Sequence, residues 1–242
     1  MIEKIRIIRT NLPGVKLYLS TNAQLLSEKR SRILLEENLL DVINFDIDGL
    51  NKNTFEGIRV KLDFDVVTKN VMYFLNYKKE LNKSNPETRV TIIDMKPTKD
   101  EVSGFIAHWS RYADKVDVNH YGTWGGTQDD LNYDHGHIKD EHDFKLTESM
   151  TNGFDFACTH PWEEMVIGAD GRVGLCCLDH ELNEQVGDVK DKTIEQIWHG
   201  DVINSYRTKM LNLDYSSIGS CKNCNAHTFQ SNKTWAKLQK SN

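Results

Sequence analysis

The first half of the chain alternates between short segments typical of β-strands and longer segments typical of helices. The strand-like segments are rich in β-branched or aromatic residues and cover residues 15–20, 42–47, 89–93 and 115–119. Strands separated by helices of this length cannot pair as hairpins. We therefore predict a parallel sheet, joined by right-handed crossovers, with helices covering one of its faces.

Two of the intervening helices are predicted from apolar residues that recur at spacings of three and four. The first is marked by Phe64, Val67, Val71, Phe74 and Leu75, and the second by Val102, Phe105, Ile106, Trp109 and Tyr112. A capping box from Thr98 to Glu101, directly after Pro97, predicts where the second helix begins.

Polar and small residues follow the predicted strands, at positions 20–22, 46–49, 94–95 and 120–124. Parallel sheets of this kind bind ligands at the carboxyl ends of their strands. We therefore expect a binding site at this edge of the sheet.

Length and charge narrow the classes of function. The 242 residues suffice for one large domain or for a medium domain with a small appendage, and 38% hydrophobic residues suffice for a core. The net charge of -6, with acidic and basic residues mixed along the chain, gives no basic stripe and argues against nucleic acid as a partner. The chain shows neither an apolar run near the ~20 residues that cross a bilayer nor a signal-peptide pattern, so we expect a cytoplasmic protein without a membrane partner.

All five cysteines follow residue 157. Because cytosolic thiols stay reduced, clustered cysteines there are more often metal ligands or catalytic groups than disulfides. Cys158 and Cys176 flank a predicted hairpin, and Cys221 and Cys224 form a C-x-x-C pair, so a hairpin and a loop can bring four thiolates to one point. Cys177 is expected to pack instead, because neighbouring residues of a strand face opposite sides.

Four thiolates suit either zinc or an iron–sulfur cluster. Zinc ribbons usually present two close C-x-x-C pairs, whereas this chain has one, which weakens the zinc interpretation. A zinc-stapled structural domain and unligated buried or redox cysteines stay open as alternatives.

The hairpin itself is predicted from segments 164–167 and 172–175, which flank Asp170 and Gly171. A capping box between Thr193 and Gln196 predicts a short helix that ends near residue 200.

The segment before the cysteines is polar and aperiodic and predicts a linker or lid over residues 127–152. A second metal site at its histidines His135, His137 and His142 is conceivable, but a solvated loop is the favoured interpretation.

These motifs together resemble a radical S-adenosylmethionine (radical SAM) enzyme with a C-terminal SPASM-type domain in its shorter, one-cluster "twitch" form. Cys158, Gly171 and Cys176 fit the cysteine–glycine–cysteine spacing that opens the SPASM pattern, and Cys221 with Cys224 fits its next element. The resemblance implies one auxiliary [4Fe–4S] cluster bound by Cys158, Cys176, Cys221 and Cys224.

The upstream half is similar to the later part of the family's partial (β/α)6 barrel. Residues 20–23 resemble the family's T-N-G strand end, residues 45–49 its F-S-I-D-G segment, and residues 55–59 its Y-E-x-I-R segment. The resemblance implies that Asp46, which stands where serine is usual, Asp48 and Arg59 contact S-adenosylmethionine. The alternative is that Asp48 belongs to an ordinary strand-to-helix turn and that Arg59 is a solvated helix residue.

The family's C-x-x-x-C-x-x-C loop and G-G-E segment do not occur in this sequence. We therefore expect a C-terminal fragment, with part of a barrel in residues 1–126 and an α+β SPASM/twitch domain in residues 153–242. Without the first strands, residues 15–20 would form an unpaired sheet edge that invites association and lowers solubility, unless a separate chain supplies the missing part.

The resemblance implies an oxidoreductase that abstracts hydrogen from a small polar substrate or a peptide through a 5′-deoxyadenosyl radical. Flavodoxin or ferredoxin would be the electron donor. The alternative function is a non-catalytic iron–sulfur or zinc module that transfers electrons or binds a partner.

Overall fold

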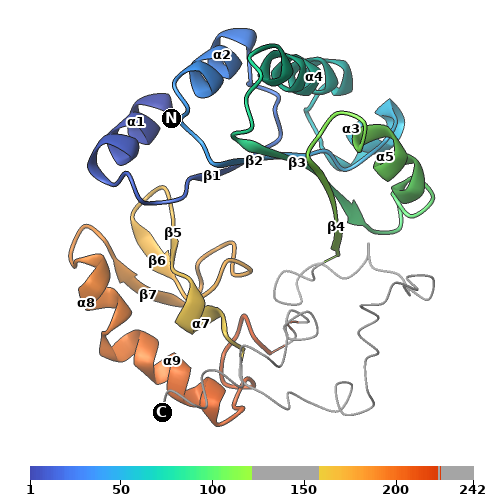
Figure 1. The fold of residues 1–242 in the computed structure, drawn as a ribbon. Coiled ribbons are helices and arrows are strands. Elements are labelled where there is room, and N and C mark those ends of the chain that lie inside the picture. The colour runs from blue at the N-terminus through green and yellow to red at the C-terminus, as the bar shows by residue number, and fades with distance from the viewer. Residues whose placement is uncertain (122–157, 223, 225–242) are drawn as a thin grey trace. The chain divides into compact units, whose positions relative to one another are not determined.

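A computed structural model describes residues 1–121, 158–222 and 224 of the protein (Figure 1). The chain divides into two compact units, Met1–Tyr121 and Gly122–Asn242. The linker or lid predicted over 127–152, with His135, His137 and His142, lies outside the described residues.

The first unit is a four-stranded parallel sheet with helices along one side (Figure 1). Its strands, in order across the sheet, are β1 (Tyr18–Thr21), β2 (Val42–Asp46), β3 (Glu87–Asp94) and β4 (Lys115–His120). Its helices are α1 (Ile2–Asn11), α2 (Glu28–Glu36), α3 (Lys52–Ile58), α4 (Phe64–Glu80) and α5 (Val102–Trp109). The predicted parallel sheet is confirmed, and β1 is an edge strand of it within the described part of the chain.

The two faces of this sheet differ in chemistry. Ile43 and Phe45 of β2 are fully buried, and the Phe45 ring meets Phe74 of α4 edge to face at 5.5 Å. Because side chains alternate along a strand, Asn44 and Asp46 lie on the opposite face. The register places Ser20, Asn44 and Arg89 in one row across that face, and Asp46, Thr91 and Asp117 in the next. The sheet therefore presents an apolar face to the helices and a polar face away from them.

Two carboxylates connect helices to the sheet at the amino ends of its strands. Asp41 accepts hydrogen bonds from the Leu17 amide (2.7 Å) and from Arg9 of α1, and together these lower its pKa. Asp114 accepts from the Thr88 amide (2.7 Å) and from Lys78 of α4 (2.5 Å). These contacts fasten helices to the end of the sheet opposite the expected binding edge.

The capping box predicted from Thr98 to Glu101 is wrong. The α5 helix begins at Val102, and no side chain caps it within the described part of the chain. The Thr98 hydroxyl instead donates to the Ile93 carbonyl oxygen (2.5 Å) and closes the turn after β3. The Glu101 carboxylate accepts from the Leu50 amide (2.5 Å). The Thr98 hydroxyl and the Glu101 carboxylate are therefore bonded to other partners and do not cap the helix.

The second unit contains a three-stranded antiparallel sheet and short helices. The strands are β5 (Val166–Ile167), β6 (Arg172–Gly174) and β7 (Gln185–Asp188), and the helices are α7 (His160–Glu163), α8 (Ile194–Trp198) and α9 (Asp201–Leu211). Its buried core residues are Val173, Leu175, Val186, Ile197, Ile203, Met210, Tyr215 and Ile218. No helix in the described part of the chain is long and apolar enough to cross a membrane.

Both local predictions for this unit are confirmed. Strands β5 and β6 form the hairpin, with Gly171 at a φ of 94° that favours glycine. The Thr193 hydroxyl accepts from the Gln196 amide (3.2 Å), and the Gln196 side chain accepts from the Thr193 amide (2.9 Å), which completes the capping box of α8. The third strand of this sheet, β7, has no counterpart among the elements predicted from the sequence.

Substitution Phe45→Ala tests whether the contact between β2 and α4 organises the first unit. Removing a fully buried aromatic ring is expected to lower the free energy of unfolding by about 3–5 kcal/mol, as transfer energy and a residual cavity combine. Val60→Ala is the control, because Val60 is 72% exposed and should change stability by less than about 0.5 kcal/mol. Denaturant unfolding of both variants measures the difference, and equal losses would contradict this packing.

Candidate metal centre and carboxylate cluster

Asp46 ends β2 on the polar face of the sheet. Its Oδ2 accepts a hydrogen bond from the Ser20 hydroxyl (2.7 Å), and its Oδ1 accepts from the Asn44 amide group (2.7 Å). Asn44 in turn accepts from the Thr91 hydroxyl (2.6 Å). Burial raises the pKa of the Asp46 carboxyl, and the hydrogen bond from Ser20 opposes this shift. Residues of β1, β2 and β3 thus orient one carboxylate at the carboxyl end of the sheet.

Asp48 and Arg59 form an ion pair beside this network. Asp48 is 2% exposed, and its Oδ2 accepts from Nε (2.8 Å) and Nη2 (2.5 Å) of Arg59. Its Oδ1 accepts from the Ile93 amide (3.0 Å). Both Asp48 oxygens are therefore engaged within the chain, whereas the Arg59 side chain is one-third exposed (34%). Since the positive charge of Arg59 also acts on Asp46, the structure brings all three predicted residues together.

Gly49 explains how the chain makes this turn. A Cβ atom at this position would lie 2.7 Å from the Phe55 amide nitrogen, which is closer than van der Waals contact permits. Glycine therefore lets α3 approach the end of β2, and this approach places Arg59, at the end of α3, beside Asp48.

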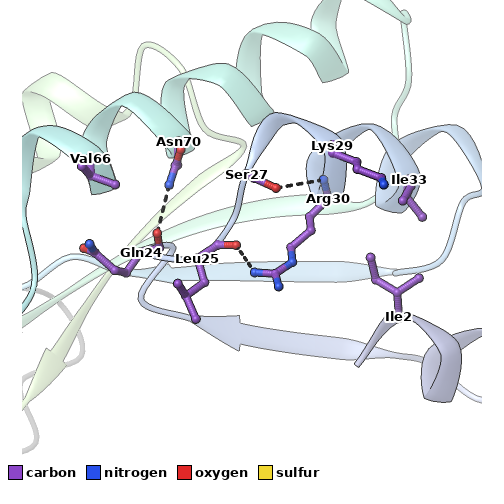
Figure 2. A pocket seen from close by; sticks show the side chains of 9 residues that line it. All are labelled: Ile2, Gln24, Leu25, Ser27, Lys29, Arg30, Ile33, Val66 and Asn70. Atoms are coloured by element: carbon purple, nitrogen blue, oxygen red, sulfur yellow. Dashed lines mark hydrogen bonds between the residues drawn. The ribbon is translucent and has the colours of Figure 1, made fainter.

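A separate groove of about 740 Å³ opens on the helical side of the first unit (Figure 2). Its lining includes Ile2, Leu25, Arg30 and Asn70. Asn70 donates a hydrogen bond to the Gln24 carbonyl oxygen (3.3 Å), which joins α4 to the β1–α2 loop. None of the predicted site residues lines this groove.

The four predicted metal-binding cysteines line a single small cavity in the second unit. Cys158 precedes α7, Cys176 follows β6, and Cys221 and Cys224 follow α9. Leu175 and Met210 contribute to its apolar wall, and His160, Asp179 and Glu184 contribute polar groups. The structure thus brings three separate segments of the chain to one place.

The environment of two of these thiols, Cys176 and Cys221, favours their neutral form when no metal is bound. Burial raises the pKa of Cys221 to about 12. The pKa of Cys176 is also raised, by its hydrogen bond with Cys177 and by burial. Thiolates form in such a cavity when a metal replaces the protons, so the donor set fits a bound metal or cluster.

Neighbouring groups fix the orientation of two of these cysteines. The Cys158 amide donates to the Tyr215 hydroxyl (2.7 Å), and the Leu178 amide donates to the Cys176 sulfur (3.4 Å). Amide hydrogen bonds to cysteine sulfur are a normal feature of iron–sulfur sites and tune their reduction potentials.

The packing role predicted for Cys177 is wrong, because its side chain is exposed. The prediction assumed a strand, but β6 ends at Gly174, and the Asp179 amide donates to the Cys176 carbonyl oxygen to form a turn. Cys176 and Cys177 therefore do not face opposite sides. Their sulfur atoms lie within 4.8 Å of each other and of side-chain atoms of His160 and Glu164, which the sequence analysis did not single out.

Comparison with known families supports the cysteine cavity as an iron–sulfur site. Residues 158–225 match the model of the SPASM family, described as an iron–sulfur cluster-binding domain. This region of the chain is therefore similar to the SPASM domain. A search of curated protein sequences finds no match.

Solved structures of radical SAM/SPASM enzymes share the fold. BtrN in complex with AdoMet and 2-DOIA is 16% identical with a TM-score of 0.51, over 93% of this chain and 65% of BtrN. The enzyme anSMEcpe with bound AdoMet and Kp18Cys peptide is 16% identical with a TM-score of 0.58, over 92% of this chain and 70% of that one. SuiB from Streptococcus suis is 14% identical with a TM-score of 0.58, over 86% of this chain and 54% of SuiB.

These comparisons confirm the predicted fold class, an α/β unit with a parallel sheet like that of these enzymes, followed by a region similar to the SPASM domain. At this level of identity they show the fold alone. The chain spans 54–70% of the length of these three enzymes.

Asp46→Asn is expected to change how stability depends on pH. A carboxyl with a raised pKa stabilises the folded state fully below its unfolded pKa, and this contribution is lost as pH rises through the folded value. The variant should therefore gain stability relative to the wild type as pH rises from about 4. Urea unfolding at a series of pH values measures this difference.

Ser20→Ala provides the matched variant, because it removes a hydrogen bond that favours the charged carboxylate. Its stability should fall more steeply than that of the wild type over the same pH range. A wild-type pH profile in both variants would contradict the assigned environment of Asp46.

Arg59→Met tests the ion pair with Asp48. The substitution leaves a buried carboxylate without its counter-charge, and we expect a loss of about 1–3 kcal/mol, less than for a fully buried pair because Arg59 is partly exposed. Adding Asp48→Asn should recover part of this loss. Denaturant unfolding of the two single variants and the double variant gives the coupling energy, and additive losses would show that the two residues stabilise the fold independently.

Proposed function

We propose that this chain is the C-terminal part of a radical SAM/SPASM enzyme that binds an auxiliary [4Fe–4S] cluster through Cys158, Cys176, Cys221 and Cys224. The observation that carries this proposal is the convergence of four cysteines from three segments on one cavity, within the region that matches the SPASM model. The raised pKa of Cys221 agrees with thiols that need a metal to become thiolates.

The first unit would supply part of the S-adenosylmethionine site. The oriented Asp46 carboxylate is suited to accept hydrogen bonds from ribose hydroxyl groups, and Arg59 has exposed area with which to meet a carboxylate or an adenosyl group. Asp48 would act through Arg59, because its own oxygens are engaged by Arg59 and the Ile93 amide. These roles follow the resemblance to the family and the position of the residues at the carboxyl ends of parallel strands.

The reaction we propose is an oxidation or other hydrogen abstraction on a small polar substrate or a peptide. In this class of chemistry, S-adenosylmethionine and iron–sulfur clusters supply one-electron reduction and hydrogen abstraction, and the protein supplies binding and orientation. The polar face of the sheet, with Asp117 in the same row as Asp46 and Arg89 in the row before it, offers charges of both signs to such a substrate.

The partners we propose follow from the missing motif. Because the sequence has no C-x-x-x-C-x-x-C loop, the first cluster would come from additional polypeptide, either a separate chain or a longer form of this one. A flavodoxin or ferredoxin would donate the electron, and the complex would work in the cytoplasm. The same missing motif favours, as a second candidate function, a non-catalytic iron–sulfur module for electron transfer or partner binding.

Metal analysis of the anaerobically purified chain tests the cluster. We expect about four iron and four sulfide per chain, because four cysteine ligands complete one [4Fe–4S] cluster. Cys221→Ser combined with Cys224→Ser should lose the iron, while Cys177→Ser, which alters a sulfur outside the proposed ligand set, should keep it. One zinc per chain without visible absorbance would contradict the proposal and support a zinc-stapled domain.

A further inference from the structure

A second set of metal-binding atoms lies beside the cysteine cavity. Side-chain donor atoms of His160, Glu164, Cys176 and Cys177 all lie within 4.8 Å of one another. Under the proposed function, Cys176 belongs to the iron–sulfur cluster. The other three residues then form a group of one nitrogen, one oxygen and one sulfur donor outside the proposed cluster ligands, although His160 also lines the cysteine cavity.

Local structure holds the first two of these residues on one side of α7. His160 opens the helix and Glu164 follows its last residue, so the two are one helical turn apart and the Glu164 amide donates to the His160 carbonyl oxygen (3.0 Å). This spacing brings His160 Nδ1 to 2.7 Å from Glu164 Oε1. Cys177 reaches the same point from the turn after β6.

The Glu164 oxygen is the observation that points to a ligand. Oε1 is buried from solvent and makes no hydrogen bond of acceptable geometry with any described residue, although His160 Nδ1 lies close to it. A buried carboxylate oxygen without a directed donor needs a cation to neutralise it, which can be the protonated His160 imidazole 2.7 Å away or a metal ion bound between the two side chains. A metal ion between the imidazole, the carboxylate and the thiolate would satisfy all three groups.

We propose that His160, Glu164 and Cys177 bind a divalent ion of the zinc class beside the iron–sulfur site. Imidazole nitrogen, carboxylate oxygen and thiolate sulfur are the three ligand types that zinc takes in proteins. Three protein ligands leave a fourth tetrahedral position open, as in zinc sites that bind water or substrate. The exposed side chain of Cys177 places this position within reach of small molecules. This inference rests on the proposed function in one respect: Cys176 is taken as a ligand of the iron–sulfur cluster and not of the zinc ion.

The test measures zinc separately from iron. The full chain is purified anaerobically, incubated with one equivalent of Zn²⁺, desalted, and analysed for zinc, iron and sulfide. We expect about one zinc per chain in addition to the iron. The single variants His160→Gln, Glu164→Gln and Cys177→Ser should each lower zinc retention at least tenfold and keep iron and sulfide at wild-type levels, which also shows that they fold.

His180→Gln is the matched control, because His180 also lies beside a glutamate (3.4 Å from Glu181) but is outside the group of converging donors. It should retain zinc. X-ray absorption at the zinc edge should show one sulfur neighbour at about 2.3 Å with nitrogen and oxygen neighbours at about 2.0 Å.

Several results would overturn the inference. A wild-type chain that holds iron but no zinc after incubation would show that His160 and Glu164 are only an ion pair. Zinc retention that the three variants leave unchanged would place the ion elsewhere. A third result would refute both this site and the proposed function. In that case the wild type holds no iron, its zinc has four sulfur neighbours, and the double variant Cys221→Ser with Cys224→Ser loses the zinc. A fourth result would separate the two proposals. If the chain holds no iron and loses zinc only in the His160, Glu164 and Cys177 variants, the proposed function is refuted and this zinc site is supported.

Discussion

The second unit depends on one constraint: cysteines from three separate segments must meet at one buried cavity. In its described part, this unit has strands of two to four residues and helices of four to eleven residues, and small units of this kind usually need a metal or a disulfide for stability. The core of this unit lies directly against the cavity, since Leu175 and Met210 belong to both. Tyr215, another core residue, accepts the hydrogen bond from the Cys158 amide. Metal binding and folding are therefore expected to be coupled here.

The first unit follows a different principle, in which one sheet serves two purposes. Its apolar face packs against the helices, as Phe45 does against Phe74, and this packing leaves the other face free for polar groups. The carboxylates at the two ends of the strands differ accordingly. Asp41 and Asp114 join helices to the sheet at the amino ends, whereas Asp46 is held by short side chains at the carboxyl ends, where ligands bind. The amino ends of the strands thus carry contacts that stabilise the fold, and the carboxyl ends carry the groups that are available for binding.

Much of this arrangement could be predicted from the sequence, because it depends on local patterns. Segments rich in β-branched and aromatic residues, separated by helices with apolar spacings of three and four, predicted the parallel sheet. Asp170 with Gly171 predicted the hairpin, and Thr193 with Gln196 predicted a helix start. The failures occurred where tertiary contacts prevail. Glu101 bonds to the Leu50 amide across 51 positions, and Cys177 lies in a turn where a strand was assumed. The pairing of Asp48 with Arg59 and the convergence of His160, Glu164 and Cys177 likewise depend on distances that a sequence pattern does not contain.

We propose that Cys158, Cys176, Cys221 and Cys224 hold one iron–sulfur cluster. Anomalous X-ray scattering at the iron edge, from crystals of the anaerobically purified chain, tests it most directly. We expect a compact group of four iron atoms in the cavity, each bonded to one of these four sulfurs. A single scatterer that appears at the zinc edge and not at the iron edge, bonded to the same four sulfurs, would contradict it.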